Sequence, residues 1–452
     1  LRMRLKLFQR ALPDLPETGL YTFDQESEHS KSRVHLRVDQ DQSGVMILDA
    51  SQVVHLNPTA TFIAWLVLNK IERTQAVKAI LKHYRIDRQQ AEMDFERISA
   101  QTSALIDKEQ ALCPVCDLDL VSAMPFSSTL SAPYRMDLAI TYRCNNNCAH
   151  CYNARERHFP ELPAQKWFEI IDHLWELRIP HVVFTGGEPT LRDDLIDLVS
   201  YAQTKGMVTG LNTNGRRLAD KLFVDRLVEA GLDHVQITVE SNDPDVHDQM
   251  VLARGAWEET REGLRNAVNS RLYLMTNTTL LSSNAGRLDE ILTFLADEHV
   301  PTIGLNALIY SGHGATVQTG LKENDLPPLL EKATKFTQNS GQRLIWYTPT
   351  QYCHFNPLLL SLGVKGCTAA YYNMCLEPNG DVLPCQSYYE SLGNILSNSW
   401  ESIWQHPLAE SLRHRQNIPD GCRRCDFLLE CGGGCPLARE HQTVEPIIEA
   451  FS

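Results

Sequence analysis

The hydrophobic positions between residues 134 and 341 alternate between short β-rich runs and longer stretches with helical spacing. Apolar side chains recur three and four residues apart in the longer stretches, whereas the short runs are almost continuously apolar. We predict six strands, at Met136–Thr141, His181–Thr185, Val208–Asn212, His234–Val239, Leu272–Thr278 and Ile303–Ile309. The predicted helices are Ala164–Leu177, Asp194–Lys205, Ala219–Ala230, Trp257–Asn269, Arg287–Glu298 and Leu326–Gln338.

This alternation predicts an α/β fold in which parallel strands are joined by right-handed crossovers. Six units fall short of the eight that close a barrel, so we expect an open, partial (β/α)6 barrel. Ligands of such folds gather at the C-terminal ends of the strands. The first strand ends in a cysteine-rich loop and the second in Gly186-Gly187-Glu188-Pro189, so both segments are expected at the mouth of the barrel.

A different pattern occupies residues 33–110, where short strands come first and helices follow. The predicted strands are Val34–Val38, Gly44–Leu48 and Gln52–Leu56, the last two forming a hairpin around residues 49–51. The predicted helices are Thr59–Leu68, Arg73–His83 and Arg88–Ala104, and Asn57 followed by Pro58 is a recognised helix start. This order predicts a winged-helix-like module, although a small α/β appendage without a binding role has the same pattern.

Composition and charge narrow the function classes. The 452 residues suggest about three domains, and 43% apolar with 22% charged residues is ordinary for a globular chain. Asp and Glu (56) outnumber Lys and Arg (42), and no basic stripe is visible, which argues against nucleic-acid binding. The longest apolar stretch, Phe62–Leu68, is too short to span a membrane. No export signal is visible at the start of the printed sequence, so we expect a cytoplasmic protein without a membrane partner.

The thirteen cysteines lie in front of and behind the strand–helix region. Cys113 and Cys116 form a CxxC pair, and Cys144, Cys148 and Cys151 form a CxxxCxxC loop. The others are Cys353, Cys367, Cys375, Cys385, Cys422, Cys425, Cys431 and Cys435. Clustered cysteines in such a chain bind metal or do redox chemistry more often than they form disulfides.

The CxxxCxxC loop has the donors for an iron–sulfur centre. Three thiolates four and three residues apart can converge on one cubane cluster, and they leave its fourth iron open to a small molecule. A zinc site is the alternative, and it would need a fourth protein donor, for which His150 inside the loop is the nearest candidate.

The segment Cys144-Asn-Asn-Asn-Cys148-Ala-His-Cys151-Tyr152 resembles the signature loop of the radical S-adenosylmethionine (SAM) enzymes. Gly186-Gly187-Glu188-Pro189 resembles the segment that binds the SAM amino group in that superfamily, although by itself it also fits an ordinary Gly-rich turn. The resemblance covers residues 134–341. It implies that the open iron binds SAM, and that an electron from the cluster cleaves SAM to methionine and a 5′-deoxyadenosyl radical. A reductant such as flavodoxin or ferredoxin is the implied source of that electron.

Further SAM contacts are implied at two strand ends. Asn214 lies in Asn212-Thr213-Asn214-Gly215, where the family contacts the ribose and the carboxylate. Thr238 and Ser241 lie in Thr238-Val239-Glu240-Ser241, where related enzymes often have Ser-Leu-Asp-Gly.

The C-terminal cysteines resemble a SPASM domain, the auxiliary-cluster extension of this superfamily. Twelve residues separate Cys367 from Gly380 and four separate Gly380 from Cys385; the run Cys422-x2-Cys425-x5-Cys431-x3-Cys435 follows. Structural zinc is the alternative. By resemblance, a first auxiliary cluster has the ligands Cys367, Cys375, Cys385 and Cys435, and a second has Cys422, Cys425 and Cys431. Together with the SAM-binding cluster, this gives three [4Fe-4S] clusters.

The second auxiliary cluster departs from the family pattern, which ends with one more cysteine. The sequence has none after Cys435, so His441, an acidic residue or solvent could complete the cluster, or the cluster could be labile. Cys113 and Cys116 could ligate metal or donate to this cluster, while Cys353 is expected to be structural or adventitious.

The segment Val45–Leu56, followed by Asn57-Pro58-Thr59-Ala60, resembles the RiPP recognition element, a peptide-binding domain related to the pyrroloquinoline-quinone peptide chaperone. (RiPPs are ribosomally synthesised, post-translationally modified peptides.) In that family a leader peptide adds a strand to the sheet edge. A winged helix also occurs in DNA-binding proteins, but the acidic balance of this chain argues against that role.

The combined expectation is a radical SAM maturase that modifies a ribosomal precursor peptide by hydrogen abstraction. Oxidative cross-linking fits the auxiliary clusters, although epimerisation, thioether formation and backbone excision use related architectures. The expected domains are a peptide-binding domain (1–110), a linker with the CxxC pair (111–133), the partial barrel (134–341) and the SPASM domain (342–452). No catalytic side chain is assigned, and the sequence does not tell whether Glu240, Gln386 or Tyr388 faces the substrate.

Two alternatives remain. One is a maturase of the anaerobic sulfatase type, which is expected to place an Asp base near the SPASM cysteines. Here Gln386 follows Cys385, and an amide cannot act as a carboxylate base. The other is a non-catalytic iron–sulfur electron carrier, which leaves Gly186–Pro189 unexplained.

Overall fold

The computed structural model describes residues 12–26, 31–48, 52–106, 130–153 and 158–441. The chain divides into two compact units, Leu1–Ala123 and Met124–Ser452, and each is described by itself. Cys113, Cys116 and the turn predicted at residues 49–51 lie outside the described residues.

The first unit is an antiparallel sheet followed by three helices. The strands are in the order β1-β2-β3-β4, with bounds Gly19–Glu26, Lys31–Val38, Gly44–Leu48 and Gln52–Leu56. The helices are α1 (Pro58–Leu68), α2 (Arg73–His83) and α3 (Arg88–Ile106). The three predicted helices are present, but the prediction of three strands omitted β1. This strand pairs with β2 along its whole length, and its aromatic side chains pack against the core of the unit.

Local signals position the first helix as predicted. The Asn57 side chain accepts a hydrogen bond from the Ala60 N–H at 2.9 Å, and Pro58 occupies the first turn. Behind this cap, Phe62, Ile63 and Leu66 are buried against the sheet and the other helices. Helix α1 therefore supplies much of the apolar core of the small unit.

The second unit contains a nine-stranded sheet in the order β11-β10-β9-β8-β7-β6-β5-β12-β13. Neighbours from β11 to β12 are parallel, and only β13 is antiparallel. The bounds from β5 to β10 are Arg135–Thr141, His181–Gly186, Val208–Thr213, His234–Thr238, Tyr273–Thr279 and Thr302–Asn306. The last strands are β11 (Arg343–Trp346), β12 (Asn373–Leu376) and β13 (Val382–Leu383). The predicted α/β fold with a parallel, partial barrel is confirmed.

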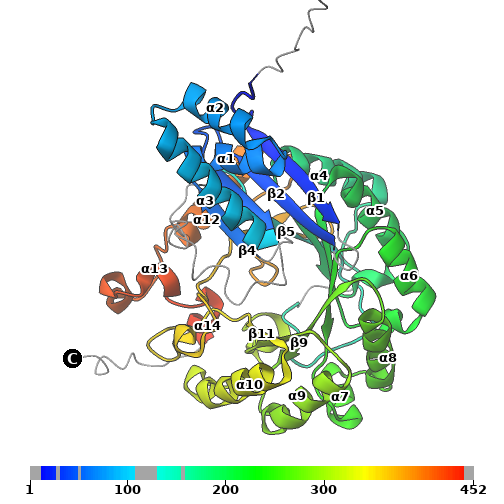
Figure 1. Cartoon of the computed structure of the whole chain (residues 1–452). Helices are drawn as coiled ribbons and strands as arrows, with labels where there is room; N and C mark the ends of the chain where they lie inside the picture. The colour runs from blue at the N-terminus through cyan, green and yellow to red at the C-terminus, as the bar shows by residue number, and fades with distance from the viewer. Residues whose placement is uncertain (1–11, 27–30, 49–51, 107–129, 154–157, 442–452) are drawn as a thin grey trace, which may run out of the picture. The chain divides into compact units, whose positions relative to one another are not determined.

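Helices follow the outside of this sheet in an arc (Figure 1). Their bounds are α4 (Ala164–Glu176), α5 (Leu195–Lys205), α6 (Lys221–Glu229), α7 (Pro244–Val251), α8 (Ala256–Val268), α9 (Leu288–Asp297) and α10 (Leu326–Ser340). Helix α7 was not predicted, because it is short and lies within the connection between β8 and α8. In α4, the buried Trp167, Ile170, Ile171 and Leu174 show the expected helical spacing.

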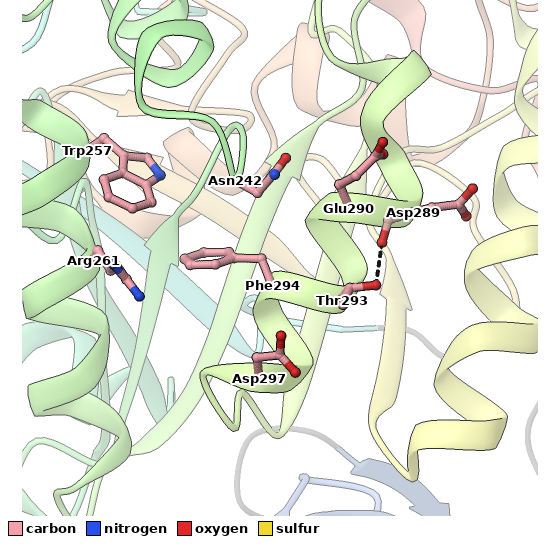
Figure 2. A pocket seen from close by; sticks show the side chains of 8 residues that line it. All are labelled: Asn242, Trp257, Arg261, Asp289, Glu290, Thr293, Phe294 and Asp297. Carbon is pink, nitrogen blue, oxygen red and sulfur yellow. Dashed lines mark hydrogen bonds between the residues drawn. The ribbon is translucent and has the colours of Figure 1, made fainter.

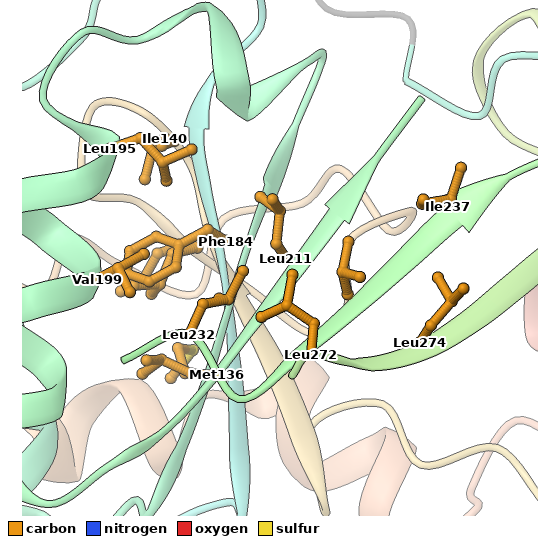
Figure 3. Close-up of a cluster of buried hydrophobic side chains, with 14 of the residues drawn as sticks. Met136, Ile140, Phe184, Leu195, Val199, Leu211, Leu232, Ile237, Leu272 and Leu274 are labelled. Carbon is orange, nitrogen blue, oxygen red and sulfur yellow. The ribbon is translucent and has the colours of Figure 1, made fainter. Parts of the chain in front are cut away.

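The main core lies between the strands and these helices (Figure 3). In β5, Met136 and Ile140 point into this core, as Figure 3 shows. Because side chains alternate along a strand, Asp137 and Ala139 point to the opposite face, which is the interior of the partial barrel. The barrel interior therefore receives every second side chain of each strand.

The remaining chain, up to residue 441, is built from short elements. These are α11 (Trp400–Trp404), α12 (Pro407–Arg413), α13 (Leu428–Cys431) and α14 (Pro436–His441). Strands β11 to β13 come from the segment after residue 341 but belong to the barrel's sheet. Among the residues that the structure describes, no helix is long and apolar enough to cross a membrane.

Candidate active site

The CxxxCxxC loop begins directly after β5 and is held at several points by backbone hydrogen bonds. The N–H groups of Asn147 and Ala149 donate to the last residues of α7, at 2.9 and 3.0 Å. On the other side, the Cys151 carbonyl accepts the His313 N–H at 2.9 Å. Two distant segments thus fix the loop at the C-terminal end of the sheet, where the sequence predicted it.

The three thiols of this loop lie close enough to influence one another. Burial, followed by the negative charges of Cys151, Glu240 and Cys144, raises the pKa of Cys148 well above its usual value. Thiolates at these positions therefore need a positive partner, and an iron–sulfur cluster supplies one. Within the described residues, no three His, Cys, Asp or Glu side chains converge on one point as they would around a single metal ion. In a cubane cluster, by contrast, each cysteine binds a different iron.

His150, the candidate fourth donor for zinc, pairs with a buried carboxylate instead. Its Nε2 lies 2.9 Å from Glu240 Oε1, and both side chains are buried. Burial opposes the charged imidazole, but attraction and hydrogen bonding to Glu240 outweigh it and raise the pKa of His150. Glu240 also accepts the Thr279 N–H at 2.9 Å. It therefore ties the cysteine loop to the end of β9.

The two glycines of Gly186–Pro189 permit a close approach of this segment to the cysteine loop. Gly186 has a φ of +136°, and a Cβ there would lie 2.0 Å from the Thr141 carbonyl oxygen. A Cβ on Gly187 would lie 2.4 Å from the Arg143 oxygen. The N–H groups of Gly187 and Glu188 donate to Thr141 and Arg143, each at 2.8 Å. No larger residue fits without moving the loop backbone.

Glu188 joins this segment to the next strand end. Its carboxylate, which is 1% exposed, accepts the Thr190 N–H at 3.1 Å, the Thr213 hydroxyl at 2.7 Å and the Asn214 N–H at 2.8 Å. Burial raises the pKa of Glu188, although these hydrogen bonds oppose the rise. The Glu188 side chain thus holds the Gly186–Pro189 segment against the end of β7.

The other predicted SAM contacts lie at the ends of β7 and β8. The Asn214 amide donates to the Asn145 side chain in the cysteine loop at 2.7 Å. Thr238 is the last residue of β8 and is half-buried. Ser241 is fully buried, and its hydroxyl accepts the Asp243 N–H at 3.1 Å. The structure brings these residues to one end of the barrel, and their roles toward SAM stay predictions.

A second group of cysteines lies in the C-terminal segment. Burial and then the charge of Cys435 raise the pKa of Cys367 to about 12. Burial and then Cys367 raise the pKa of Cys385 to about 12, with a smaller contribution from Cys435. Cys375 is buried, and its neighbours include Cys385. The four predicted ligands of the first auxiliary cluster therefore come together, although Cys435 lies 68 positions after Cys367 in the sequence.

A cavity of about 200 Å³ adjoins Cys367. Arg415 and Arg439 also line it, and their positive charges lower the pKa of Cys367 against the larger effects of burial and Cys435. Cys367 is the one predicted cluster ligand that lines this cavity, and the two arginines place positive charge beside it.

The third group contains Cys422, Cys425 and Cys431. Burial, then the charges of Cys431 and Cys425, raise the pKa of Cys422. Cys425 is exposed, so this group lies nearer the surface than the second one. His441, a suggested further ligand, stacks on the Tyr310 ring at 5.7 Å between centroids.

Two tyrosines connect the cysteine loop with the C-terminal segment. The Tyr142 hydroxyl donates to Glu377 at 3.0 Å, and the Tyr152 hydroxyl donates to the Gln386 side-chain oxygen at 3.2 Å. Gln386 therefore faces the barrel mouth, while Tyr388 lines the cavity beside Cys367.

Sequence reasoning missed Asp137, a fully buried carboxylate in the barrel. It pairs with Arg135 at 3.0 Å and is in register with Cys375 of β12. Burial raises the pKa of Asp137, and the Arg135 charge opposes the rise. The signal was available, because a single acidic residue interrupts the otherwise apolar run Met136–Ile140.

A pocket of about 550 Å³ lies outside this site, between α8 and α9 (Figure 2). Trp257 and Arg261 of α8 face Phe294 and several acidic residues of α9 across it. None of the predicted site residues lines this pocket.

Comparisons with known proteins agree with this arrangement. Residues 138–295 match the radical SAM superfamily, and residues 367–426 match the SPASM iron–sulfur cluster-binding domain. The chain is 30% identical over 332 residues to the mycofactocin maturase MftC of Mycolicibacterium smegmatis, covering 70% of this chain and 81% of MftC. MftC of Mycobacterium tuberculosis is 28% identical over 327 residues, with the same coverage.

Solved structures show the same fold. SuiB of Streptococcus suis, bound to its precursor peptide SuiA, superposes with a TM-score of 0.68 at 15% identity, covering 93% of this chain and 97% of SuiB. The protein anSMEcpe with bound AdoMet superposes with a TM-score of 0.55 at 16% identity, covering 69% of this chain and 92% of anSMEcpe.

These findings argue against both the zinc-site alternative and the electron-carrier alternative, because the matched families are iron–sulfur enzymes. The match to MftC covers most of that enzyme, and the two matched domains contain the cysteine loop and most of the C-terminal cysteines. The chain therefore belongs to the radical SAM enzymes that carry a SPASM domain, whose cofactors are SAM and iron–sulfur clusters.

Proposed function

We propose that this enzyme modifies a ribosomally synthesised precursor peptide, which it recognises through a leader segment. The observation that carries the proposal is a separate sheet-and-helix unit that precedes the radical SAM unit in the sequence. The whole-chain likeness to SuiB, which was solved with a precursor peptide, supports it. So does the similarity to MftC, which is named as a maturase.

The leader is proposed to pair with β4, at one edge of the four-stranded sheet. This strand lies within the segment that resembles the RiPP recognition element and directly precedes α1. An edge strand offers unpaired N–H and C=O groups, so a peptide can bind by main-chain hydrogen bonds while side chains select its sequence.

At the barrel mouth, Cys144, Cys148 and Cys151 are proposed to hold the cluster that binds SAM. When bound, the cluster and SAM supply a 5′-deoxyadenosyl radical that takes hydrogen from the peptide. Gly186–Pro189, Asn214, Thr238 and Ser241 would position SAM. Glu188 and Glu240 keep these segments in place, since each is buried and hydrogen-bonded to more than one strand end or loop.

Oxidative cross-linking of two side chains is the proposed outcome, because it removes two hydrogens and leaves an electron to be accepted. The two further cysteine groups are proposed to hold two auxiliary [4Fe-4S] clusters, three in all, that accept this electron. A flavodoxin or ferredoxin would supply the electron that starts the reaction.

A sulfatase-type maturase is the second candidate. The likeness to anSMEcpe, which was solved with bound AdoMet, leaves nearly a third of this chain uncovered, against 7% for SuiB. In addition, the Tyr152 hydroxyl donates to Gln386, a position where this interpretation needs a carboxylate base.

The test is anaerobic mass spectrometry of a short peptide encoded beside the gene, after incubation with reconstituted enzyme, SAM and reductant. Loss of two hydrogens from the peptide is expected. Deoxyadenosine without any change in the peptide would contradict the assignment and favour a different peptide or a protein substrate. The Cys144→Ala/Cys148→Ala/Cys151→Ala variant is the control, since it removes the proposed SAM-binding cluster alone.

Leader binding is tested separately with Val54→Pro and His55→Pro in the full-length enzyme. These residues pair with Met46 and Val45 of β3, and successive N–H groups of an antiparallel strand point alternately to the partner and to the open edge. One of the two variants should therefore fold normally and bind the peptide at least about tenfold more weakly, since a lost hydrogen bond of about 1.4 kcal/mol changes affinity tenfold. If both variants fold and bind the precursor peptide as tightly as the unchanged enzyme does, β4 is excluded as the leader site.

A further inference from the structure

Cys353 lies outside the matched SPASM region (residues 367–426), but the turn that contains it contacts Cys431 just beyond that region. It occupies a turn at residues 352–354, beyond β11. The N–H of the preceding Tyr352 donates to Cys431 Sγ at 3.4 Å, and Cys431 Sγ lies 3.6 Å from the Thr350 carbonyl oxygen. This turn is therefore packed directly on the Cys431 sulfur.

Two further contacts hold the turn there. The rings of Tyr352 and Phe427 lie 6.2 Å apart. Gly434, with a φ of +74°, allows close approach on the other side, since a Cβ there would lie 2.8 Å from the Gln351 side chain and 3.2 Å from its backbone nitrogen. Contacts on both sides of Cys431 thus fix the position of residue 353.

The Cys353 thiol shares an environment with the third cysteine group. Burial, then the charges of Cys431 and Cys422, raise the pKa of Cys353 to about 11. Within that group, Cys422 is influenced by Cys431 and Cys425, and Cys431 by Cys425. The Cys353 thiol therefore lies within electrostatic range of Cys431 and Cys422, and Cys425 lies within range of those same two thiols.

We propose that Cys353 supplies the fourth thiolate for the cluster held by Cys422, Cys425 and Cys431. The four cysteines then bind the four irons, each thiol losing its proton as it binds. Such a cluster has no open iron, so it transfers electrons and does not bind substrate. The proposal rests on the second auxiliary cluster of the proposed function, but not on the identity of the peptide.

A neighbouring histidine is the main rival donor. His354 Nδ1 lies 2.9 Å from Glu323 Oε2, while its buried Nε2 has no hydrogen-bond partner among the described residues. Metal-binding histidines are often oriented by a carboxylate in this way. Thiolate is nevertheless the usual donor of iron–sulfur clusters, and the charges of the group act on the Cys353 thiol.

The experiment uses the full chain carrying Cys144→Ala/Cys148→Ala/Cys151→Ala, so that only auxiliary clusters remain after anaerobic reconstitution. The iron content, the sulfide content, and the Mössbauer and EPR spectra of this protein are compared with those of the same protein carrying the additional substitution Cys353→Ala. We expect iron to fall from about eight toward about four atoms per chain, with loss of one cluster's spectrum. Cys425→Ala should give the same loss, and His354→Ala should keep both clusters.

Unchanged iron and spectra in Cys353→Ala would overturn the proposal. It is equally overturned if His354→Ala, or Cys113→Ala with Cys116→Ala, removes the cluster while Cys353→Ala does not. A parent with only one auxiliary cluster would also overturn it, without bearing on whether the peptide is the substrate.

A second measurement does not depend on any variant. Cys353 is an exposed residue, so a long incubation with iodoacetamide should label it in the iron-free protein even though its raised pKa slows the reaction, and it should be protected in the anaerobically reconstituted protein. Peptide mapping by mass spectrometry quantifies this protection. Equal labelling with and without iron would exclude ligation by Cys353.

Discussion

The cysteine loop of the barrel and the cysteines of the C-terminal segment are organised in different ways. The cysteine loop follows a single strand, β5, and its three cysteines lie within eight residues, from Cys144 to Cys151. The C-terminal cysteines come from turns, one short strand and short helices spread between Cys353 and Cys435. Local spacing therefore brings the first set together, whereas the second set needs the folded chain.

Burial differs between the C-terminal groups as well. Cys375 is 1% exposed, whereas Cys353 and Cys425 are exposed at the surface. Solvent reaches exposed thiolates and their irons more readily, so the cluster proposed near Cys425 should be lost first in air. The cysteine loop of the barrel is held by backbone hydrogen bonds to α7 and to residues 313–314. Its conformation should therefore depend on these backbone contacts more than that of the C-terminal groups does.

The largest effect is expected from Cys148→Ala in the barrel loop. It should reduce deoxyadenosine formation to the level without enzyme, because the proposed SAM-binding cluster loses one of its three proposed ligands. Cys367→Ala should lower it less than about tenfold (about 1.4 kcal/mol in the barrier) while stopping peptide modification. Chromatography of deoxyadenosine and mass spectrometry of the peptide measure the two steps. Equal loss of both steps in both variants would remove the functional distinction between the regions.

Glu240→Ala should destabilise the barrel region most. It leaves His150 and the Thr279 N–H buried without their partner, and breaking such a pair costs about 3–5 kcal/mol of unfolding free energy. Urea denaturation of the iron-free protein measures the change. Asp225→Ala is the control, since the exposed pair with Lys221 contributes less than about 0.5 kcal/mol. Equal effects would show that the Glu240 network is not what holds the loop.

Gly187→Ala should have the next largest effect. Its Cβ would collide with the oxygens of Arg143 and Tyr142, at 2.4 and 2.6 Å, and overpacking of this kind costs about 2–3 kcal/mol. The displaced loop should also lose most SAM cleavage. Gly286→Ala, where no atom lies within 4 Å, is the matched substitution and should leave stability and cleavage unchanged. A normal Gly187→Ala enzyme would mean that the loop tolerates displacement.

Tyr142→Phe should have the smallest effect and tests the contact between the regions. It removes the buried hydrogen bond to Glu377, worth about 1–2 kcal/mol, and should lower the urea midpoint accordingly. Tyr21→Phe loses an exposed hydrogen bond to Glu17 and should change the midpoint by less. If the two variants behave alike, the Tyr142–Glu377 contact does not couple the loop to the C-terminal segment.

The strand and helix pattern was predictable where periodicity is strong. All six barrel strands and their following helices appear within a few residues of their predicted bounds. Helix α7 was missed because it is a short insertion within a connection, and β1 because its half-polar sequence becomes a strand only by pairing with β2.

The site was predictable to the level of its motifs. The CxxxCxxC spacing predicted that Cys144, Cys148 and Cys151 act together, because these three thiols are close in the sequence. Glu240 looked like a departure from the family's Asp, and only the folded chain gives it a partner in His150.

The sequence alone determined the parallel fold, the cluster loop and the family, since periodicity and short-range spacing are properties of the chain. The tertiary structure decided which distant residues meet. Asp137 beside Cys375, and Cys353 beside Cys431, come from segments that sheet pairing and turn packing bring together. Long-range contacts of this kind depend on the balance of burial and hydrogen bonding across the whole fold, which no local pattern contains.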